Sequence, residues 1–174
     1  MEKNKKFSLE LTVKNDEVVE TFDSLKELQE MGLDNAYMDE FVYVYAILKS
    51  NVGSDKSIGL IAHMDTAPVV SGANVNPRIV ENYDGKDIVL NNELGIAIRT
   101  AEYPEIKEYE GQSLIVTDGT TLLGADDKAG IAEILTAVEN ILVNNISHPA
   151  IKIAFTPDEE IGRGADLFDV EGFG

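Results

Sequence analysis

Three short segments of the sequence carry side chains that could bind a metal ion. They are "AHMDT" with His63 and Asp65, "LLGADDKAG" with Asp126, and "TPDEEIGRG" with Glu159 and Glu160. Imidazole nitrogen and carboxylate oxygen together form a ligand set that zinc accepts. The chemistry that such a set could support is hydrolysis of a polarised bond by a metal-held water molecule.

Spacing within each segment suggests how the side chains divide this work. Residues two apart on an extended chain point the same way, so Asp65 could orient the ring of His63 from the nitrogen that the metal does not use. A carboxylate such as Asp126 can bridge two metal ions about 3.5–4 Å apart. Of the adjacent Glu159 and Glu160, one could bind metal while the other takes a proton from water, and spacing does not decide which.

Each segment also has a simpler interpretation. His63 could be a polar residue at a strand edge, and the glutamate pair could lie in a solvated loop. Asp126 and Asp127 could cap the helix that follows them, since carboxylates favour helix N-termini. The other histidine of the chain, His148 in "NISHPAIK", is predicted to be structural. The three segments together are harder to explain in this way than any one alone.

The elements that would position these segments are strands and helices in alternation. The sequence predicts strands over 41–48, 57–63, 113–117 and 151–156, a short one in "DIVLN", and helices over 17–32 and from Ala129 to Val143. The apolar run 57–63 is typical of a strand buried on both faces. This order predicts an α/β layer fold with a largely parallel sheet.

The order of strands also predicts where the acidic segments meet. Each of the three segments follows a predicted strand. Ligands of open α/β sheets bind beyond the carboxyl ends of the strands. We therefore expect the three segments to converge at one edge of the sheet.

Composition excludes several classes of protein. Asp and Glu number 32 against 14 Lys and Arg, a net charge of −18, which disfavours binding to nucleic acids and to anionic membranes. The length of 174 residues suits one domain, and no apolar run is long enough to span a bilayer. The sequence lacks cysteine, and its first residues do not form a secretory signal, so we expect a cytoplasmic protein.

The quoted motifs carry a family resemblance. "AHMDT", "LLGADDKAGIAEIL" and "AFTPDEEIGRGA" resemble the dinuclear zinc aminopeptidase and carboxypeptidase superfamily, and "SGANVNPRIVENYDG" with "VTDGTTLLGADDKAG" resembles its peptidase T family. The resemblance implies a three-layer zinc-peptidase domain with a largely parallel mixed sheet flanked by helices. It also implies two zinc ions, replaceable by cobalt or manganese in vitro, and removal of the N-terminal residue of a tripeptide substrate.

The resemblance implies a role for each candidate residue. His63 would be a ligand of one zinc, and the carboxylate of Asp126 would bridge both zincs. A cis peptide bond between Asp126 and Asp127 would let that carboxylate reach both ions. Glu160 would be a ligand of the other zinc. Asp65 would orient His63, and Glu159 would be the general base that activates water.

The resemblance also implies that residues 1–174 are the N-terminal part of a zinc peptidase catalytic domain. A further acidic ligand beyond "FDVEGFG" and a distant histidine ligand would lie outside the chain, with the lid or dimerisation domain and the C-terminal part of the catalytic domain. The full-length protein could form a homodimer through that domain. The chain alone is therefore expected to be inactive.

Two other functions stay open at this point. Another hydrolase of the superfamily, a dipeptidase or an N-acyl amino acid acylase, would share the metal motifs, although "NVNPRIVENYDG" argues against it. A non-catalytic acidic domain that binds a metal or a partner is the alternative from a different class. The sequence contains no EF-hand loop spacing for calcium.

Overall fold

The computed structural model describes residues 13–14, 17–18 and 20–174, and it divides the chain into two compact units. The first unit combines the chain up to Pro68 with Gly124–Gly174, and the second is Val69–Leu123. The chain leaves the first unit at Pro68 and returns to it at Gly124.

The first unit is built on a sheet of four strands in the order β3-β4-β10-β5. The strands are β3 (Tyr37–Met38), β4 (Val44–Leu48), β10 (Ala150–Thr156) and β5 (Ser57–His63). Strand β10 runs parallel to β5 and antiparallel to β4, and β3 pairs with β4 antiparallel. The predicted mixed sheet is confirmed, but only one of its three pairings is parallel.

Two features explain the smaller share of parallel pairing. A short turn joins β3 to β4, and such a connection produces antiparallel neighbours. The predicted strand over 113–117 forms β9 (Leu114–Val116), which belongs to the second unit and does not extend the sheet. The second of the three candidate segments therefore follows a strand outside this sheet.

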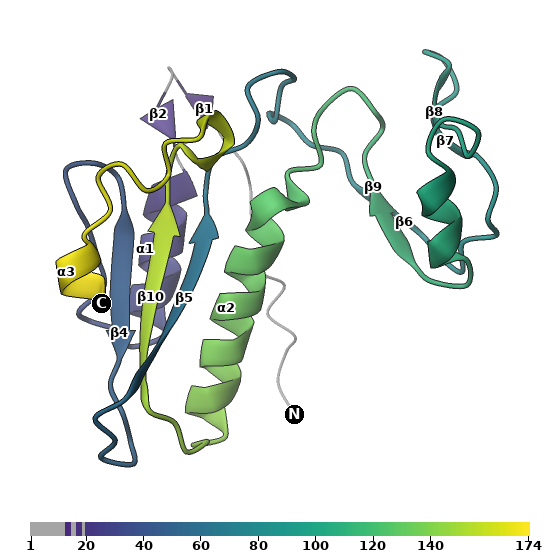
Figure 1. Ribbon diagram of the computed structural model, residues 1–174. Helices are drawn as coiled ribbons and strands as arrows, with labels where there is room; N and C mark the ends of the chain where they lie inside the picture. Colours follow the sequence, from purple (N-terminus) through teal and green to yellow (C-terminus); the bar gives the residue numbers. More distant parts are fainter. Residues whose placement is uncertain (1–12, 15–16, 19) are drawn as a thin grey trace. The chain divides into compact units, whose positions relative to one another are not determined.

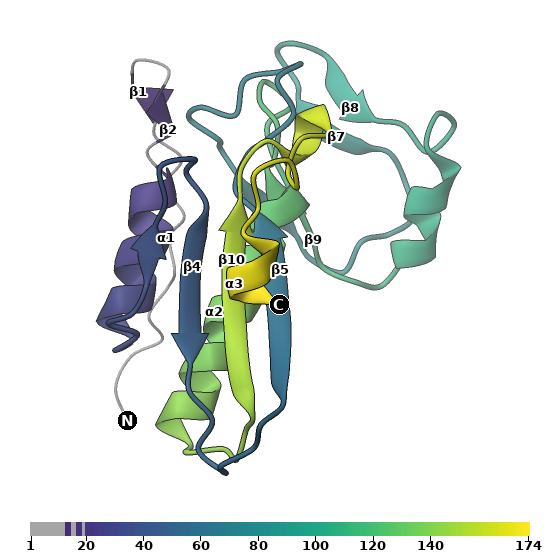
Figure 2. The same cartoon turned by 60° about the vertical axis from the view of Figure 1, so that its left-hand side comes forward.

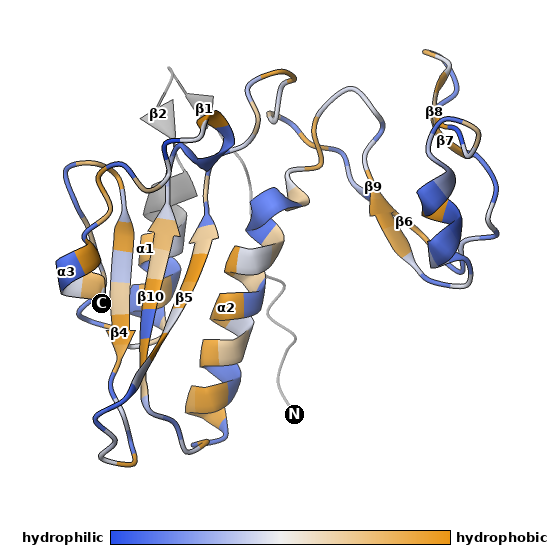
Figure 3. Ribbon diagram, in the orientation of Figure 1, coloured by the Kyte–Doolittle hydropathy of each residue, from blue (hydrophilic) through white to orange (hydrophobic). Residues whose placement is uncertain are grey.

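Two helices cover one face of the sheet (Figures 1 and 2). They are α1 (Glu20–Glu30) and α2 (Ala125–Val143). Figure 3 shows that the two central strands of the sheet, β4 and β10, carry mostly apolar residues. The core of this face contains Leu28, Val44, Ile131, Leu135, Val138, Ile153 and Phe155, all at most 1% exposed. Leu28 from α1 and three residues of α2 therefore share one apolar layer with the strands.

The C-terminal segment covers part of the other face. Tyr45 of β4 and Ala154 of β10 form a second cluster with Phe168 and Phe173, and α3 (Val170–Phe173) lies on this side of the sheet (Figure 2). Glycine at position 59 leaves room for this packing, because a Cβ there would lie 2.8 Å from the ring of Phe173. The predicted arrangement of a sheet flanked by helices is confirmed.

Strand β5 differs from the expectation of burial on both faces. It is the last strand in the order of the sheet, and Ile58 and Ile61 are 51% and 53% exposed. Only its carboxyl end, at Ala62 and His63, is buried. The prediction was wrong because an apolar run records how hydrophobic a strand is and not whether it lies at the centre or the edge of a sheet.

The ends of two predicted elements also shift. Strand β4 begins at Val44, because Asp39 accepts hydrogen bonds from the backbone N–H groups of Phe41 and Tyr43 and so forms a turn. Residues 17–18 form the short strand β2, which pairs with β1 (Val13–Lys14), so the predicted helix over 17–32 starts at Glu20. Residue 19, between β2 and α1, lies outside the described residues.

The second unit has a small core of its own. Strand β6 (Arg78–Val80) pairs with β9, and β7 (Ile88–Asn91) pairs with β8 (Ile96–Ile98), all antiparallel. A 3₁₀ helix, η1 (Pro104–Tyr109), lies between β8 and β9 in the chain. The buried residues of this core are Tyr83, Ile88 and Val116. None of the helices in the described part of the chain has both the length and the apolar character needed to cross a bilayer.

Candidate metal centre

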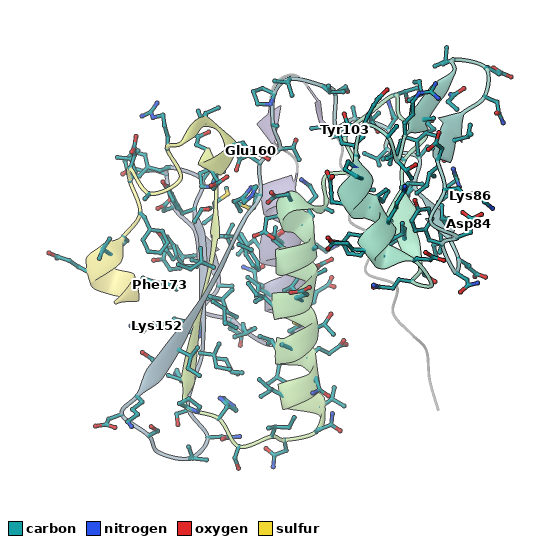
Figure 4. All side chains as sticks on the ribbon, turned by 45° about the vertical axis from the view of Figure 1, so that its right-hand side comes forward. Asp84, Lys86, Tyr103, Lys152, Glu160 and Phe173 are labelled. Carbon is teal, nitrogen blue, oxygen red and sulfur yellow. The ribbon has the colours of Figure 1, made fainter. Side chains whose placement is uncertain are left out.

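The carboxyl ends of two parallel strands set the position of the candidate site. His63 is the last residue of β5 and lies beside Thr156, the last residue of β10. Glu159 and Glu160 begin the 3₁₀ helix η2 (Glu159–Ile161) three residues further on, and Figure 4 marks Glu160 at this end of the sheet. Because the strands run parallel, the imidazole and the glutamate pair reach the same edge.

The third segment enters from the start of α2. Asp126 and Asp127 have non-helical backbone angles and are joined by a cis peptide bond, as the family resemblance implies. The carboxylate of Asp127 accepts a hydrogen bond from the backbone N–H of Gly130 at 3.1 Å and so caps the helix. Asp126 makes no such cap, since its Oδ1 lies 2.8 Å from Nε2 of His63. The capping alternative therefore holds for only one of the two aspartates.

The structure brings three of the predicted ligands together. One ligand atom from each of His63, Asp126 and Glu160 lies within 4.8 Å of the others. His63 is only 7% exposed, whereas the side chain of Asp126 is 86% exposed. Glu159 also faces the group, with Oε2 3.8 Å from Nε2 of His63. The nitrogen and oxygen donors fit the ligand preferences of zinc.

Asp65 lies behind His63 and has a further set of contacts. Its Oδ1 is 3.3 Å from Nδ1 of His63, whose ring nitrogen also lies 3.0 Å from the backbone carbonyl of Asp65. The two carboxylate oxygens accept hydrogen bonds from the backbone N–H groups of Glu159 and Glu160, at 3.1 and 3.0 Å. Sequence reasoning missed this second role, because backbone amides leave no signature in side-chain identity.

The surroundings of His63 alter its affinity for protons. Burial lowers the pKa of the imidazole, but the hydrogen bond to Asp126 and the negative charge of Asp65 outweigh burial, so the pKa of His63 is raised. Carboxylates thus face both ring nitrogens. A cation placed at Nε2 would meet the same negative field that favours the proton.

His148 lies apart from this site. It is 7% exposed, and its backbone N–H and carbonyl groups both bond to Asn51, at the end of the sheet where β10 begins. Its ring nitrogen Nδ1 lies 2.7 Å from the carbonyl of Pro149. These contacts agree with the structural role predicted for it.

Comparison with known proteins finds relatives of the chain. No model of a protein family matches the chain. Peptidase T from Halothermothrix orenii is 61% identical to it over 150 residues, which are 85% of this chain and 37% of that protein. The chain is a homologue of the peptidase T family. The resemblance carried by the motifs is confirmed.

Solved structures agree with this assignment. The aminopeptidase PepT from Bacillus cereus aligns with a TM-score of 0.65 and 26% identity, over 88% of this chain and 35% of that one. A tripeptidase from Staphylococcus aureus aligns with a TM-score of 0.63 and 26% identity, over 94% of this chain and 37% of that one. This peptidase T homologue thus spans little more than a third of the length of these relatives.

Proposed function

We propose that the chain is the N-terminal part of the catalytic domain of a zinc-dependent tripeptide aminopeptidase, which removes the N-terminal residue of tripeptides. The convergence of His63, Asp126 and Glu160 on one point carries the proposal, because it assembles metal ligands from three distant segments. The homology to peptidase T supports the substrate class. The cytoplasmic location expected from the sequence belongs to the same proposal.

The proposal gives each residue of the site a task. His63 would hold one zinc ion, Glu160 the other, and Asp126 would bridge the two. Asp65 would keep Nε2 of His63 directed at the metal by holding Nδ1, from which it lies 3.3 Å away. Two zinc ions, when bound, would polarise the scissile carbonyl and make a water molecule more acidic.

Glu159 is the residue assigned to proton transfer. Its side chain is 58% exposed and faces the metal ligands without lying closest to them, a position that suits a base which reaches substrate and water. It would take a proton from the attacking water and deliver that proton to the amine that leaves. The amine must be protonated before it leaves, so one carboxylate serves both steps.

The described residues offer one imidazole and two carboxylates to two metal ions. One zinc would be bound by His63 and Asp126, and the other by Asp126 and Glu160. Each zinc would thus have two protein ligands, whereas zinc in hydrolytic sites usually has three. We therefore expect weak metal binding and little activity from the 174 residues alone. The remaining ligands, a lid and a homodimer contact would come from the further length found in the relatives.

Tripeptide hydrolysis tests the proposal directly. The 174-residue chain and the same chain continued with the remaining length of the relatives would be assayed with zinc, using a tripeptide, a dipeptide and an N-acyl amino acid. We expect turnover of the tripeptide by the extended form only. Glu159→Gln should reduce it by at least about 100-fold, and Glu171→Gln, the same change in helix α3, should not.

Three results would contradict the proposal. A preference of the extended form for the dipeptide or the N-acyl amino acid would favour another hydrolase of the superfamily. Full activity of Glu159→Gln would remove the assigned base. Hydrolysis that persists after chelation would exclude a metal mechanism.

A further inference from the structure

A buried lysine lies next to the candidate metal centre. Lys128 is 6% exposed and stands in the first helical turn of α2, two positions after Asp126. Lysine is rarely buried to this extent, and the N-terminal turn of a helix disfavours a cation. General helix stability therefore does not account for an ammonium group at this position.

One hydrogen bond of Lys128 connects α2 to the end of β5. Its Nζ donates a hydrogen bond to the carbonyl oxygen of Met64 at 3.2 Å. Met64 lies between His63 and Asp65, its side chain is 1% exposed, and its N–H bonds to the carbonyl of Thr156 at 2.8 Å. Both backbone groups of Met64 are therefore held, one by β10 and the other by α2.

This contact bears on the geometry of the metal ligands. His63 comes from β5 and Asp126 from the start of α2, so the 2.8 Å approach of their side chains depends on how these two elements are held together. A hydrogen bond from a charged donor is stronger than one between neutral groups. We propose that Lys128 is a positioning residue that fixes the His63–Asp65 segment against α2 and thereby aligns His63 with Asp126 for metal binding. This inference rests on the proposed metal centre.

Substitutions of two lysines test the inference. Lys128→Met removes the ammonium group but keeps an unbranched side chain, and Lys128→Arg keeps the charge. Lys152→Met is the matched control, because Nζ of Lys152 also donates to a backbone carbonyl, that of Gly174 at 2.7 Å, on an exposed part of β10. Lys128→Gln, neutral but able to donate, replaces the methionine variant if that variant does not fold.

The two histidines of the chain provide the readout. The ring signals of His63 and His148 would be followed by NMR at fixed pH, first without metal and then during a titration with zinc chloride. Lys128→Met should shift the signals of His63 and leave those of His148 in place. It should also raise the zinc Kd measured at His63 by about 10- to 100-fold, with partial recovery in Lys128→Arg and no change in Lys152→Met.

Several outcomes would overturn the inference. If folded Lys128→Met has the His63 signals and the zinc Kd of the wild type, Lys128 does not position the site. A lower unfolding temperature with both readouts unchanged would mean a purely structural role and would also refute it. If zinc leaves His63 unaffected both in the wild-type chain and in its extended form, the proposed metal centre fails, whereas the signals of the metal-free variants still test Lys128 separately.

Discussion

At the residue scale, the carboxylate of Asp65 joins the two strand ends that carry the candidate site. It faces Nδ1 of His63, the last residue of β5. It also accepts hydrogen bonds from the backbone N–H groups of Glu159 and Glu160, which follow β10. A carboxylate that receives several N–H groups is held in one orientation. Asp65 therefore positions the imidazole and both glutamates at once.

Replacing Asp65 with asparagine should disturb both strand ends. Asp65→Asn keeps the shape but turns one acceptor oxygen into a donor, so either Glu159 or Glu160 loses its backbone partner. Such a bond to a charged group is worth about 1.5–3 kcal/mol, and metal affinity should fall about 10- to 100-fold. Hydrogen exchange at the amides of Glu159 and Glu160 and zinc titration would measure the two effects.

Asp166→Asn provides the control for this prediction. Asp166 lies in the same C-terminal segment and pairs with Arg163 at an exposed position. It should leave the exchange rates at Glu159 and Glu160 unchanged. Protection of these amides that persists in Asp65→Asn would show that the helix η2 does not depend on Asp65.

The hydrogen bonds between Asp87 and Thr100 should make the stability of the second unit depend on pH. Its carboxylate accepts hydrogen bonds from the backbone N–H and the hydroxyl of Thr100, at 2.8 and 2.9 Å, and these bonds lower the pKa of Asp87. A lowered pKa contributes stability above the unfolded value of about 3.9, and this contribution is lost as the pH falls through the folded pKa. In Asp87→Asn, the protection of the Thr100 amide against hydrogen exchange should depend less on pH in this acidic range.

Thr100→Val separates the two bonds to Asp87. It removes the hydroxyl donor and keeps the backbone N–H, so the pKa of Asp87 should rise toward its ordinary value without reaching it. NMR titration of the carboxyl carbon would measure the change. An unchanged titration curve would show that the hydroxyl contributes nothing to the lowered pKa.

At the element scale, a close contact couples β5 to the C-terminal helix. A Cβ at position 59 would lie 2.8 Å from the ring of Phe173, so Gly59→Ala should displace α3 and destabilise the first unit by about 1–3 kcal/mol. Alanine otherwise favours a strand over glycine by about 0.5–1 kcal/mol. In a Phe173→Ala background the same substitution should therefore be neutral or stabilising.

A double-mutant cycle measured by chemical denaturation would test this coupling. The interaction free energy between Gly59→Ala and Phe173→Ala should be favourable and at least about 1 kcal/mol. Additive effects would mean that α3 does not dock on β5. Lys152→Met is a further comparison, because it removes the hydrogen bond to Gly174 without adding volume beneath Phe173.

The elements were predicted better than their arrangement. Periodicity placed β5 over 57–63, and β10 and α2 within a few residues of their ends, because local hydrophobic patterns determine these elements. It did not distinguish the edge position of β5 or assign β9 to a separate unit, because both depend on pairing between distant segments. The candidate ligands were chosen by residue type, whereas the contacts of Lys128 and of the amides bonded to Asp65 required coordinates.

At the scale of the whole molecule, the net charge of −18 opposes compactness. Repulsion among 32 acidic groups is long-ranged and weakens as salt shortens the Debye length. Raising sodium chloride from about 20 to about 200 mM should therefore increase the unfolding temperature. Calorimetry in sodium chloride and in potassium chloride should give the same increase, and a decrease in either salt would show that local ion pairs outweigh the net charge.

The parallel pairing of β5 with β10 also determines when the site can form during folding. Asp65 and Glu159 lie 94 positions apart, and the entire second unit is synthesised between them. Closing so long a loop is slow compared with forming the local turns and helices. On the ribosome, His63 must wait for β10 to emerge before Glu160 can join it. We therefore expect metal capture to be a late event, and its onset would mark completion of the sheet in a nascent chain.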